Sequence, residues 1–298
     1  MNLGSVLTAM VTPFDAHGAL DVPLAARLAS WLVERGNDGL VIAGSTGEGM
    51  SLDAAERRSL FAAVVQAVGG RAATIANVGS NDTRATIAAA AQAQAAGVDA
   101  LLVVVPYYNK PTQGGMLAHF GAVAQATSLP ILVYNIPGRT AVNMLPQTLL
   151  ELARRHSNIV GVKESSGDLK QIATILRDRP DGFRVFAGDD HLFLPCLALG
   201  ADGVVGVASH LCSCEFVQMR NAYNGGYVAQ AARIHARLLA LFDALFATTS
   251  PAPIKWAMEQ MGFAVGAPRL PLEALPPELA QRLAPLIEPY TSEVAQSR

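Results

Sequence analysis

The sequence predicts an α/β protein, a (β/α)8 TIM barrel with a helical C-terminal extension. Short, nearly continuous runs of apolar and β-branched residues recur along the 298-residue chain, and amphipathic segments fill the intervals between them. Such runs are typical of parallel strands that are buried on both faces of a sheet. Their spacing of roughly 25 to 30 residues leaves room for one helix after each strand, which is the repeat of a TIM barrel. We assign residues 1–222 to the barrel and residues 223–298 to an extension packed on it.

Eight runs qualify as strands. In chain order they are Gly4–Thr8, Gly39–Ile42, Thr74–Asn77, Ala100–Val105, Ile131–Tyr134, Ile159–Lys163, Arg184–Phe186 and Gly203–Val205. A doubly wound sheet is the structural alternative, but it usually has fewer strands and carries a Gly-x-Gly-x-x-Gly turn after its first strand. No such turn follows Gly4–Thr8.

Helical periodicity fills the gaps between these strands. Examples are Val22–Glu34, Ala54–Val68, Thr83–Ala96, Leu145–Arg155 and Leu169–Arg177. Beyond the eighth strand, three further helices are predicted: a long stretch with a potential interruption near Gly225 and Gly226, and two shorter ones. Their ranges are Glu215–Phe246, Pro253–Met261 and Pro277–Ile287.

The composition excludes several classes of protein. With 51% hydrophobic and 15% charged residues, the chain is not intrinsically disordered. A formal net charge of −2 without any basic run predicts no nucleic-acid partner. No apolar stretch approaches the length of a membrane span, and the N-terminus lacks the pattern of a signal peptide. We therefore expect a soluble, cytoplasmic protein with no membrane partner.

The three cysteines, Cys196, Cys212 and Cys214, do not form the pattern of a disulfide framework. His210 precedes the last two, so a metal site with the spacing His-x-Cys-x-Cys is conceivable. A second pair of ligands is missing from this short segment, however, and reduced, half-buried thiols are the favoured interpretation.

In a TIM barrel, catalytic residues lie at the carboxyl ends of the strands. Lys163 is the sharpest candidate, because it ends the apolar run of the sixth strand and is one of only four lysines, with Lys110, Lys170 and Lys255. Burial favours the neutral amine of a lysine, and a neutral amine attacks a ketone to form a Schiff base. The alternative is a lysine that reaches solvent or pairs with Glu164.

Other strand ends carry further candidates. Tyr134 and Tyr108 could move protons, although each could equally be a core or rim tyrosine. Ser45 and Thr46 lie in a glycine-flanked turn that can present hydroxyl and N–H groups to a carboxylate, or that can simply begin a helix. Arg139 could bind a second carboxylate bidentately or could be a solvated surface residue.

The pair Asp189 and Asp190 follows the seventh strand. Two adjacent carboxylates could serve a metal ion or act as a general base. The start of a helix is the favoured interpretation, because aspartate is a preferred residue at helix N-termini.

Together, these strand ends resemble the dihydrodipicolinate synthase / N-acetylneuraminate lyase family of lysine-dependent barrels, over nearly the whole chain. The segments that carry the resemblance are Thr12–Phe14, Gly44–Glu48, Pro106–Pro111, Tyr134–Thr140, Gly161–Ser165, Ala187–Asp190 and Pro253–Ala257. The segments around Tyr107 and Tyr108 and around Arg139 are similar to the dihydrodipicolinate synthase branch. One departure is Ser45, where that branch most often has threonine; the hydroxyl is kept.

The resemblance implies a condensation of pyruvate with aspartate-4-semialdehyde to 4-hydroxy-tetrahydrodipicolinate, in lysine and diaminopimelate biosynthesis. Lys163 would form an imine with pyruvate, and Tyr134 would move protons near it. Ser45 would link Tyr134 to Tyr108, which is expected to enter from a neighbouring subunit of a homotetramer built as a dimer of dimers. Neither a metal nor another cofactor is implied.

The remaining roles concern substrate binding. Thr46 would hold the carboxylate of pyruvate, with Gly188 and the carbonyl of Val205 at the same site. Arg139 would bind the carboxylate of the aldehyde.

Three alternatives stay open. The first is another pyruvate-dependent aldolase of the family that acts on a 2-keto-3-deoxy sugar acid or N-acetylneuraminate. The second is a non-catalytic, pyruvate-binding regulatory barrel, which would not need the set of Lys163, Tyr134 and Tyr108. The third is a metal-dependent aldolase, which would need several histidine ligands at strand ends, whereas the six histidines are scattered along the sequence.

The resemblance also bears on regulation, because many bacterial members are inhibited by lysine in a cleft between subunits. Asn81 and Tyr107 of that cleft are present here, but Ala85 stands where a glutamate is expected, and Ala54 and Arg57 stand where a histidine is expected. An ammonium ligand needs a carboxylate to offset its lost hydration, and a guanidinium repels it. Weak or absent inhibition by lysine is therefore predicted.

Overall fold

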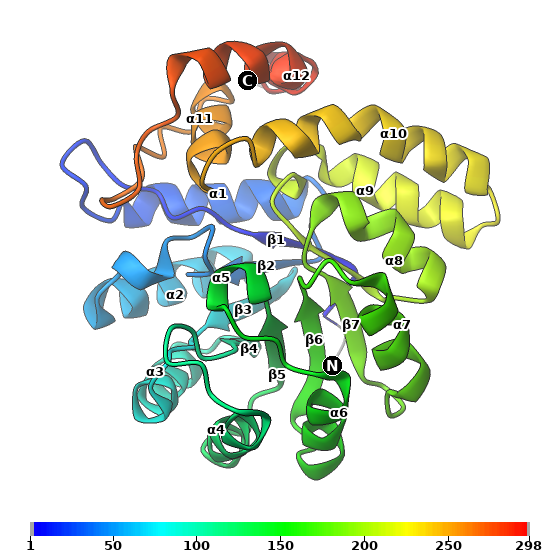
Figure 1. Ribbon diagram of the computed structural model, residues 1–298. Helices are drawn as coiled ribbons and strands as arrows, with labels where there is room; N and C mark the ends of the chain where they lie inside the picture. Colours follow the sequence, from blue (N-terminus) through cyan, green and yellow to red (C-terminus); the bar gives the residue numbers. More distant parts are fainter. Residues whose placement is uncertain (1–2, 297–298) are drawn as a thin grey trace.

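The computed structural model describes residues 3–296, in which eight parallel strands form a closed barrel in the order β1 to β8 (Figure 1). The TIM barrel predicted from the sequence is confirmed, and each observed strand overlaps its predicted run. The strands are β1 Val6–Ala9, β2 Gly39–Ile42, β3 Ala73–Asn77, β4 Ala100–Val104, β5 Ile131–Asn135, β6 Ile159–Glu164, β7 Arg184–Ala187 and β8 Gly203–Gly206.

Strand alternation divides the core into two layers. Residues such as Leu7, Leu102 and Phe186 fill the barrel interior, whereas their neighbours along each strand pack outward against the helices. On β6, Val162 belongs to the outer layer, so Lys163 faces inward. The barrel interior is therefore a packed core, and chemistry is confined to its mouth.

Helices cover the outside of the barrel, and four of them have an aspartate as the N-cap residue. The side chains of Asp21, Asp53, Asp82 and Asp168 accept backbone N–H groups of the first turn of α1, α2, α3 and α7. The helical elements up to β8 are α1 Val22–Glu34, η1 Gly49–Ser51, α2 Ala54–Val68, α3 Thr83–Ala95, α4 Gln113–Gln125, α5 Pro137–Thr140, α6 Pro146–Arg155, α7 Leu169–Asp178, η2 Asp190–Leu192 and α8 Phe193–Leu199.

The helical stretch predicted over Glu215–Phe246 is interrupted where the sequence offered a potential break, and its first helix begins earlier than predicted. The structure has α9 Ser209–Asn224 and α10 Val228–Leu245, separated at the glycine pair named as a potential interruption. Gly226 adopts a left-handed φ of 82°, which ends a helix readily because glycine has no Cβ. The two helices can therefore turn back on one another and pack side by side (Figure 1).

The last two helices, α11 Ala252–Gln260 and α12 Pro277–Gln296, complete the extension. The predicted end of the final helix at Ile287 was wrong, because α12 continues past Pro285 and Pro289. Proline disfavours a helix interior, but Leu283, Ile287 and Tyr290 are buried, and α12 contacts both α10 and α11. Tertiary packing therefore outweighs the local preference.

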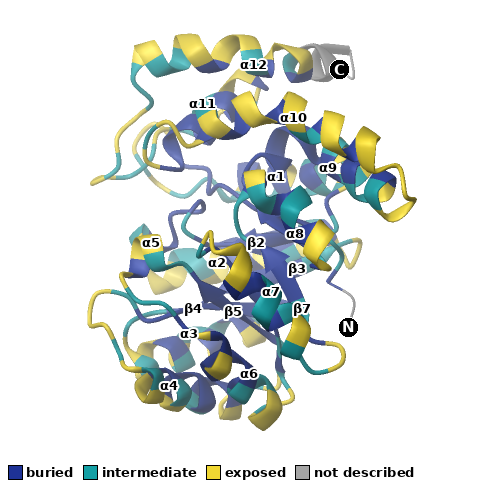
Figure 2. Ribbon diagram, turned by 45° about the vertical axis from the view of Figure 1, so that its right-hand side comes forward, coloured by how far each residue is buried: buried dark blue, intermediate teal, exposed yellow. Residues whose placement is uncertain are grey.

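The extension has one buried face and one exposed face, and it lies across one side of the barrel (Figures 1 and 2). Within residues 3–296, no helix combines the length and hydropathy that crossing a bilayer requires.

Candidate active site

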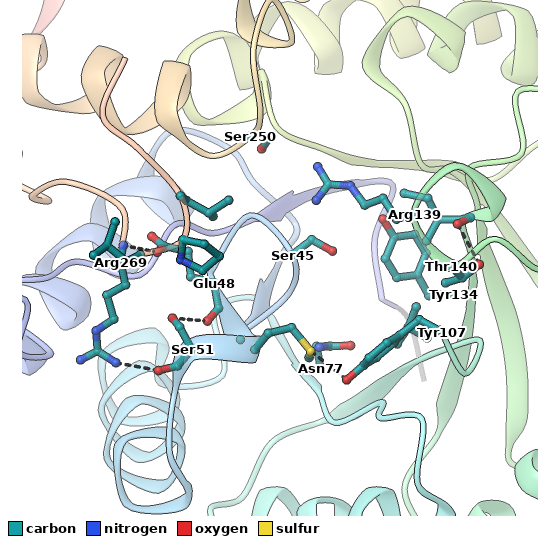
Figure 3. A pocket seen from close by; sticks show the side chains of 17 residues that line it. Ser45, Glu48, Ser51, Asn77, Tyr107, Tyr134, Arg139, Thr140, Ser250 and Arg269 are labelled. Carbon is teal, nitrogen blue, oxygen red and sulfur yellow. Dashed lines mark hydrogen bonds between the residues drawn. The ribbon is translucent and has the colours of Figure 1, made fainter. Parts of the chain in front are cut away.

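A cavity of about 440 Å³ opens at the carboxyl ends of the strands. Three residues predicted from the sequence line it, namely Ser45 after β2, Tyr134 at the end of β5 and Arg139 on α5 (Figure 3). The opposite wall comes from the C-terminal part of the chain, through Ser250 and Arg269–Leu272. The sequence argument did not anticipate that wall, because none of its residues follows a barrel strand.

Lys163 lies beside Tyr134 at the barrel mouth. The two residues are register partners on β6 and β5, and the Lys163 Nζ lies 4.4 Å from the centre of the Tyr134 ring. Both side chains are buried, with exposed fractions of 6% and 5%. Within the described part of the chain, no hydrogen bond or ion pair holds the Lys163 nitrogen, and Lys163 lies next to Tyr134 but is not itself among the residues that line the cavity. The alternative of an ion pair with Glu164 is wrong.

Glu164 points the other way, as strand alternation requires. Its carboxylate accepts hydrogen bonds from Asn135 Nδ2, Ser166 N and Gln171 Nε2. Burial raises the pKa of Glu164, and these donors oppose the shift. Asn135 and Glu164 follow Tyr134 and Lys163 directly and are register partners too. Their hydrogen bond therefore ties together the two strands that carry the lysine and the tyrosine.

The turn Gly44–Glu48 is held in a strained conformation. Ala43 and Glu48 have left-handed φ values of 55° and 50°, which L-residues other than glycine rarely adopt. Thr12 Oγ1 donates to Gly47 O at 2.6 Å, and Asn77 Nδ2 donates to Ala43 O at 2.9 Å. These contacts fix the turn that carries Ser45 and Thr46.

The members of that turn differ in exposure. Ser45 is half-buried and lines the cavity, whereas Thr46 is buried and is not among the residues that line it. The sequence argument placed both at the site, and the structure brings both to the mouth of the barrel.

Arg139 belongs to the short helix α5, which follows β5 directly. The guanidinium is exposed and lies on the cavity rim. Thr140 Oγ1 donates to Ile136 O and Val142 O, and Asn135 Oδ1 accepts from Met144 N at 3.0 Å. The loop is thus anchored, while the arginine itself stays free to meet a ligand.

Tyr108 does not line the cavity of its own chain. Its side chain is 86% exposed, and its φ of 73° is left-handed. The preceding Tyr107 lines the cavity, and its hydroxyl donates to Met50 Sδ at 3.1 Å. A residue with a Cβ keeps a left-handed backbone only where its surroundings impose it.

Gly188 and Val205 were also predicted to belong to the site, and they lie at the ends of β7 and β8. Gly188 N donates to Glu164 O at 2.8 Å, and a Cβ at this position would lie 1.8 Å from Ser165 Oγ. A larger residue at this position would therefore require the Ser165 hydroxyl to move. The Val205 side chain is buried in the barrel interior, with β8 beside β1. Neither residue lines the cavity in this structure.

The aspartate pair departs from its prediction in one respect. Asp190 begins η2, but neither side chain caps that helix. Asp190 instead accepts backbone N–H groups from Val207 and Ala208, where α9 begins. Burial raises the pKa of Asp189, and the positive charges of Lys163, His191 and Arg139 oppose that shift.

A metal site at His210, Cys212 and Cys214 does not fit the geometry. His210 Nε2 accepts from Val11 N at 3.1 Å, and its Nδ1 bonds Val207 O at 2.8 Å, so both ring nitrogens are occupied. Burial lowers the pKa of His210 to about 4, which keeps the ring neutral. Within the described chain, no group of three or more potential ligands is placed to hold a metal ion.

Comparisons with known proteins identify the family of the chain. The sequence profile of the Dihydrodipicolinate synthetase family matches residues 2–289. The 4-hydroxy-tetrahydrodipicolinate synthase of Nostoc sp. is 50% identical over 283 residues, which cover 95% of this chain and 96% of that protein.

Two solved structures are similar throughout. Dihydrodipicolinate synthase from Bacillus anthracis superposes with a TM-score of 0.94 at 40% identity, covering 97% of this chain and 98% of that one. The enzyme from Cyanidioschyzon merolae, solved with lysine bound, has a TM-score of 0.94 at 43% identity, covering 99% and 98%.

Proposed function

The chain belongs to the dihydrodipicolinate synthetase family, and on that premise we propose that it is a 4-hydroxy-tetrahydrodipicolinate synthase. It is a lyase that condenses pyruvate with aspartate-4-semialdehyde, a reaction of lysine and diaminopimelate biosynthesis. The observation that carries the mechanism is the unpaired Lys163 amine, 4.4 Å from the Tyr134 ring at the mouth of the barrel.

Lys163 attacks the ketone carbon of pyruvate, and loss of water gives an imine. The imine draws electrons from the adjacent methyl group, so a proton leaves that carbon and an enamine forms. Tyr134 is placed to move these protons, because its phenol can both donate and accept. The imine is the electron sink, so the proposed chemistry needs neither a metal nor another cofactor.

The turn after β2 supports this chemistry by binding the carboxylate of pyruvate. Thr46 and the N–H groups of its glycine-flanked turn supply donors, and Ser45 relays a proton from Tyr134. We place Gly188 and the Val205 carbonyl near the same carboxylate and ketone.

Arg139 then binds the carboxylate of the aldehyde. The enamine carbon attacks the aldehyde carbon, and the new bond converts the aldehyde to an alcohol. The substrate amine closes the ring by attacking the imine carbon, which expels Lys163 as a free amine. An exposed guanidinium on the cavity rim suits a bidentate contact with a substrate that arrives second.

The exposed Tyr108 has no role within its own chain, which supports its entry into the site of a neighbouring subunit. We therefore propose a homotetramer, arranged as a dimer of dimers, in which each tight dimer completes two sites. The three cysteines are unpaired, which accords with a reducing compartment, so we place the enzyme in the cytoplasm.

Trapping with borohydride tests the central assignment. Incubation with pyruvate and borohydride is expected to leave one reduced adduct per chain, on Lys163, and Lys163→Arg is expected to abolish it because a guanidinium stays protonated. Peptide mapping identifies the modified residue. An adduct on Lys110, Lys170 or Lys255 would refute the assignment.

Measuring turnover with aspartate-4-semialdehyde alongside sugar-acid aldehydes and N-acetylmannosamine distinguishes the synthase from the related aldolases. The synthase predicts turnover of the first compound only. A chain that forms the adduct but turns over none of these aldehydes would instead be a pyruvate-binding protein.

A further inference from the structure

Glu48 is the last residue of the turn that carries Ser45 and Thr46, and both of its carboxylate oxygens are held by the C-terminal extension. Lys255 Nζ donates to Oε1 at 2.7 Å, and the backbone N–H of Arg269 donates to Oε2 at 2.7 Å. The two side chains of this ion pair are only 1% and 2% exposed. A buried carboxylate is thus joined to two separate points of the extension.

The Lys255 amine is fully committed to structural contacts. Besides Glu48, it donates to Ala267 O at 3.3 Å, and it lies 4.2 Å from the centre of the Phe14 ring. Phe14 lies two positions after Thr12, and the Thr12 hydroxyl donates to Gly47 O in the same turn. The turn is therefore braced from the first βα loop and from the extension together.

Arg269 connects this brace to the cavity wall. Its guanidinium pairs with both oxygens of Glu56 on α2 and donates to Ser51 O at 2.8 Å. It also stacks on Phe14, 4.2 Å from the ring centre. Arg269 lies across the cavity from Tyr134 (Figure 3), and the residues that follow it, Leu270–Leu272, also line the cavity. One segment therefore both forms the wall and holds the turn.

The conformation of Glu48 indicates what this arrangement achieves. Its φ of 50° is left-handed, and a residue with a Cβ keeps such a conformation only where its surroundings impose it. A buried ion pair is weak evidence for a role in stability, since a well-packed apolar pair often serves as well. An ion pair that holds a strained residue two positions from Thr46 can instead fix the conformation of the turn.

We propose that Glu48 and Lys255 are positioning residues, which hold the Ser45–Thr46 turn in the geometry that binds the carboxylate of pyruvate. The inference rests on the proposed function, because it assigns these two residues to the pyruvate site. It makes the C-terminal extension part of the catalytic unit. Loss of the pair weakens capture of pyruvate and leaves the contact of Arg139 with the aldehyde unchanged.

The experiment measures borohydride trapping as a function of pyruvate concentration, without any aldehyde, in the full-length protein. Lys255→Met and Glu48→Gln are expected to raise the half-saturating pyruvate concentration about 10- to 100-fold, the range that a displacement near 1 Å can cause. Lys255→Arg keeps the charge and is expected to recover part of the loss. The KM for aspartate-4-semialdehyde at saturating pyruvate is expected to stay within a factor of about two.

A matched control separates positioning from general destabilisation. Arg179 pairs with Asp202, which precedes β8 at the opposite end of the barrel. Arg179→Met also removes a partly buried ion pair, and it is expected to lower the Tm without changing the pyruvate curve. If this variant shifts the curve as much as Lys255→Met does at a comparable Tm, the positioning role is wrong.

Glu48→Asp covers the case in which the other variants fail to fold. It keeps the buried charge but is one methylene too short to reach both Lys255 Nζ and Arg269 N. We expect a folded protein with a raised half-saturating pyruvate concentration, and a wild-type curve in this folded variant would overturn the inference. The absence of an adduct in the wild-type protein would instead refute the proposed function, so the two failures are distinct.

Discussion

Asp190 gives this protein a pH dependence of stability that can be calculated in sign and size. The carboxylate is buried beside the mouth of the barrel and accepts N–H groups from Val207 at 3.1 Å and Ala208 at 2.9 Å. Burial raises its pKa from 3.8 to about 6, and the neighbouring charge of Asp189 adds to the shift. The two N–H donors and the positive charge of Lys163 oppose it without cancelling it.

The sign follows from proton binding. Between pH 3.8 and about 6, the folded protein keeps a proton on Asp190 that the unfolded chain releases. Stability from this group is therefore fully present below the unfolded pKa and is lost as the pH rises through the folded pKa. The folded and unfolded pKa values of Asp190 differ by about two units, and each unit corresponds to about 1.4 kcal/mol. The folded state is therefore expected to lose roughly 3 kcal/mol of stability between a pH well below the unfolded pKa and neutral pH.

Urea denaturation of the wild type and Asp190→Asn between pH 4 and pH 7.5 measures this effect. Asparagine does not titrate, so the variant reports the contribution of every other group. The wild-type free energy of unfolding minus that of the variant is expected to fall by about 2 kcal/mol from pH 4 to pH 7, because the unfolded carboxyl is already more than half ionised at pH 4, and then to level off. A difference that stays constant, or that grows with pH, would refute the reasoning.

The remaining predictions concern the site and its regulation. Arg139→Ala is expected to raise the KM for aspartate-4-semialdehyde about 30- to 150-fold, the loss of a charge-assisted contact of about 2 to 3 kcal/mol, and equal effects on both substrates would contradict its role. Inactive Tyr108→Phe and inactive Lys163→Ala are expected to regain activity when their subunits exchange, because a mixed dimer holds one intact site; no recovery after proven exchange would place Tyr108 in its own site. Half-inhibition by lysine is expected only at concentrations above about 1 mM, which corresponds to a binding free energy of about 4 kcal/mol. The reason is that Arg57 and Tyr107 line the cavity between α2 and α3, whereas no carboxylate is among its lining residues, all of which lie within the described chain. Half-inhibition below that concentration would require a carboxylate from elsewhere.

The sequence by itself determined the barrel and the central part of the candidate site. Apolar runs mark where each buried strand ends, and a closed parallel barrel brings all those ends to one mouth. Lys163, Tyr134 and Ser45 could therefore be placed together although they are far apart in the chain. Strand alternation also separates Lys163, which faces inward, from Glu164, which faces outward, so only the lysine points toward the barrel interior.

The tertiary structure alone decided the contacts that no local pattern encodes. Glu48 and Lys255 are 207 positions apart, and nothing near either residue specifies the other. Asp190 holds the start of α9 and does not cap its own helix, and α12 continues through two prolines because its apolar face is covered. Each outcome depends on which surfaces meet when the chain closes, because burial and long-range pairing then outweigh the local preferences that a sequence displays.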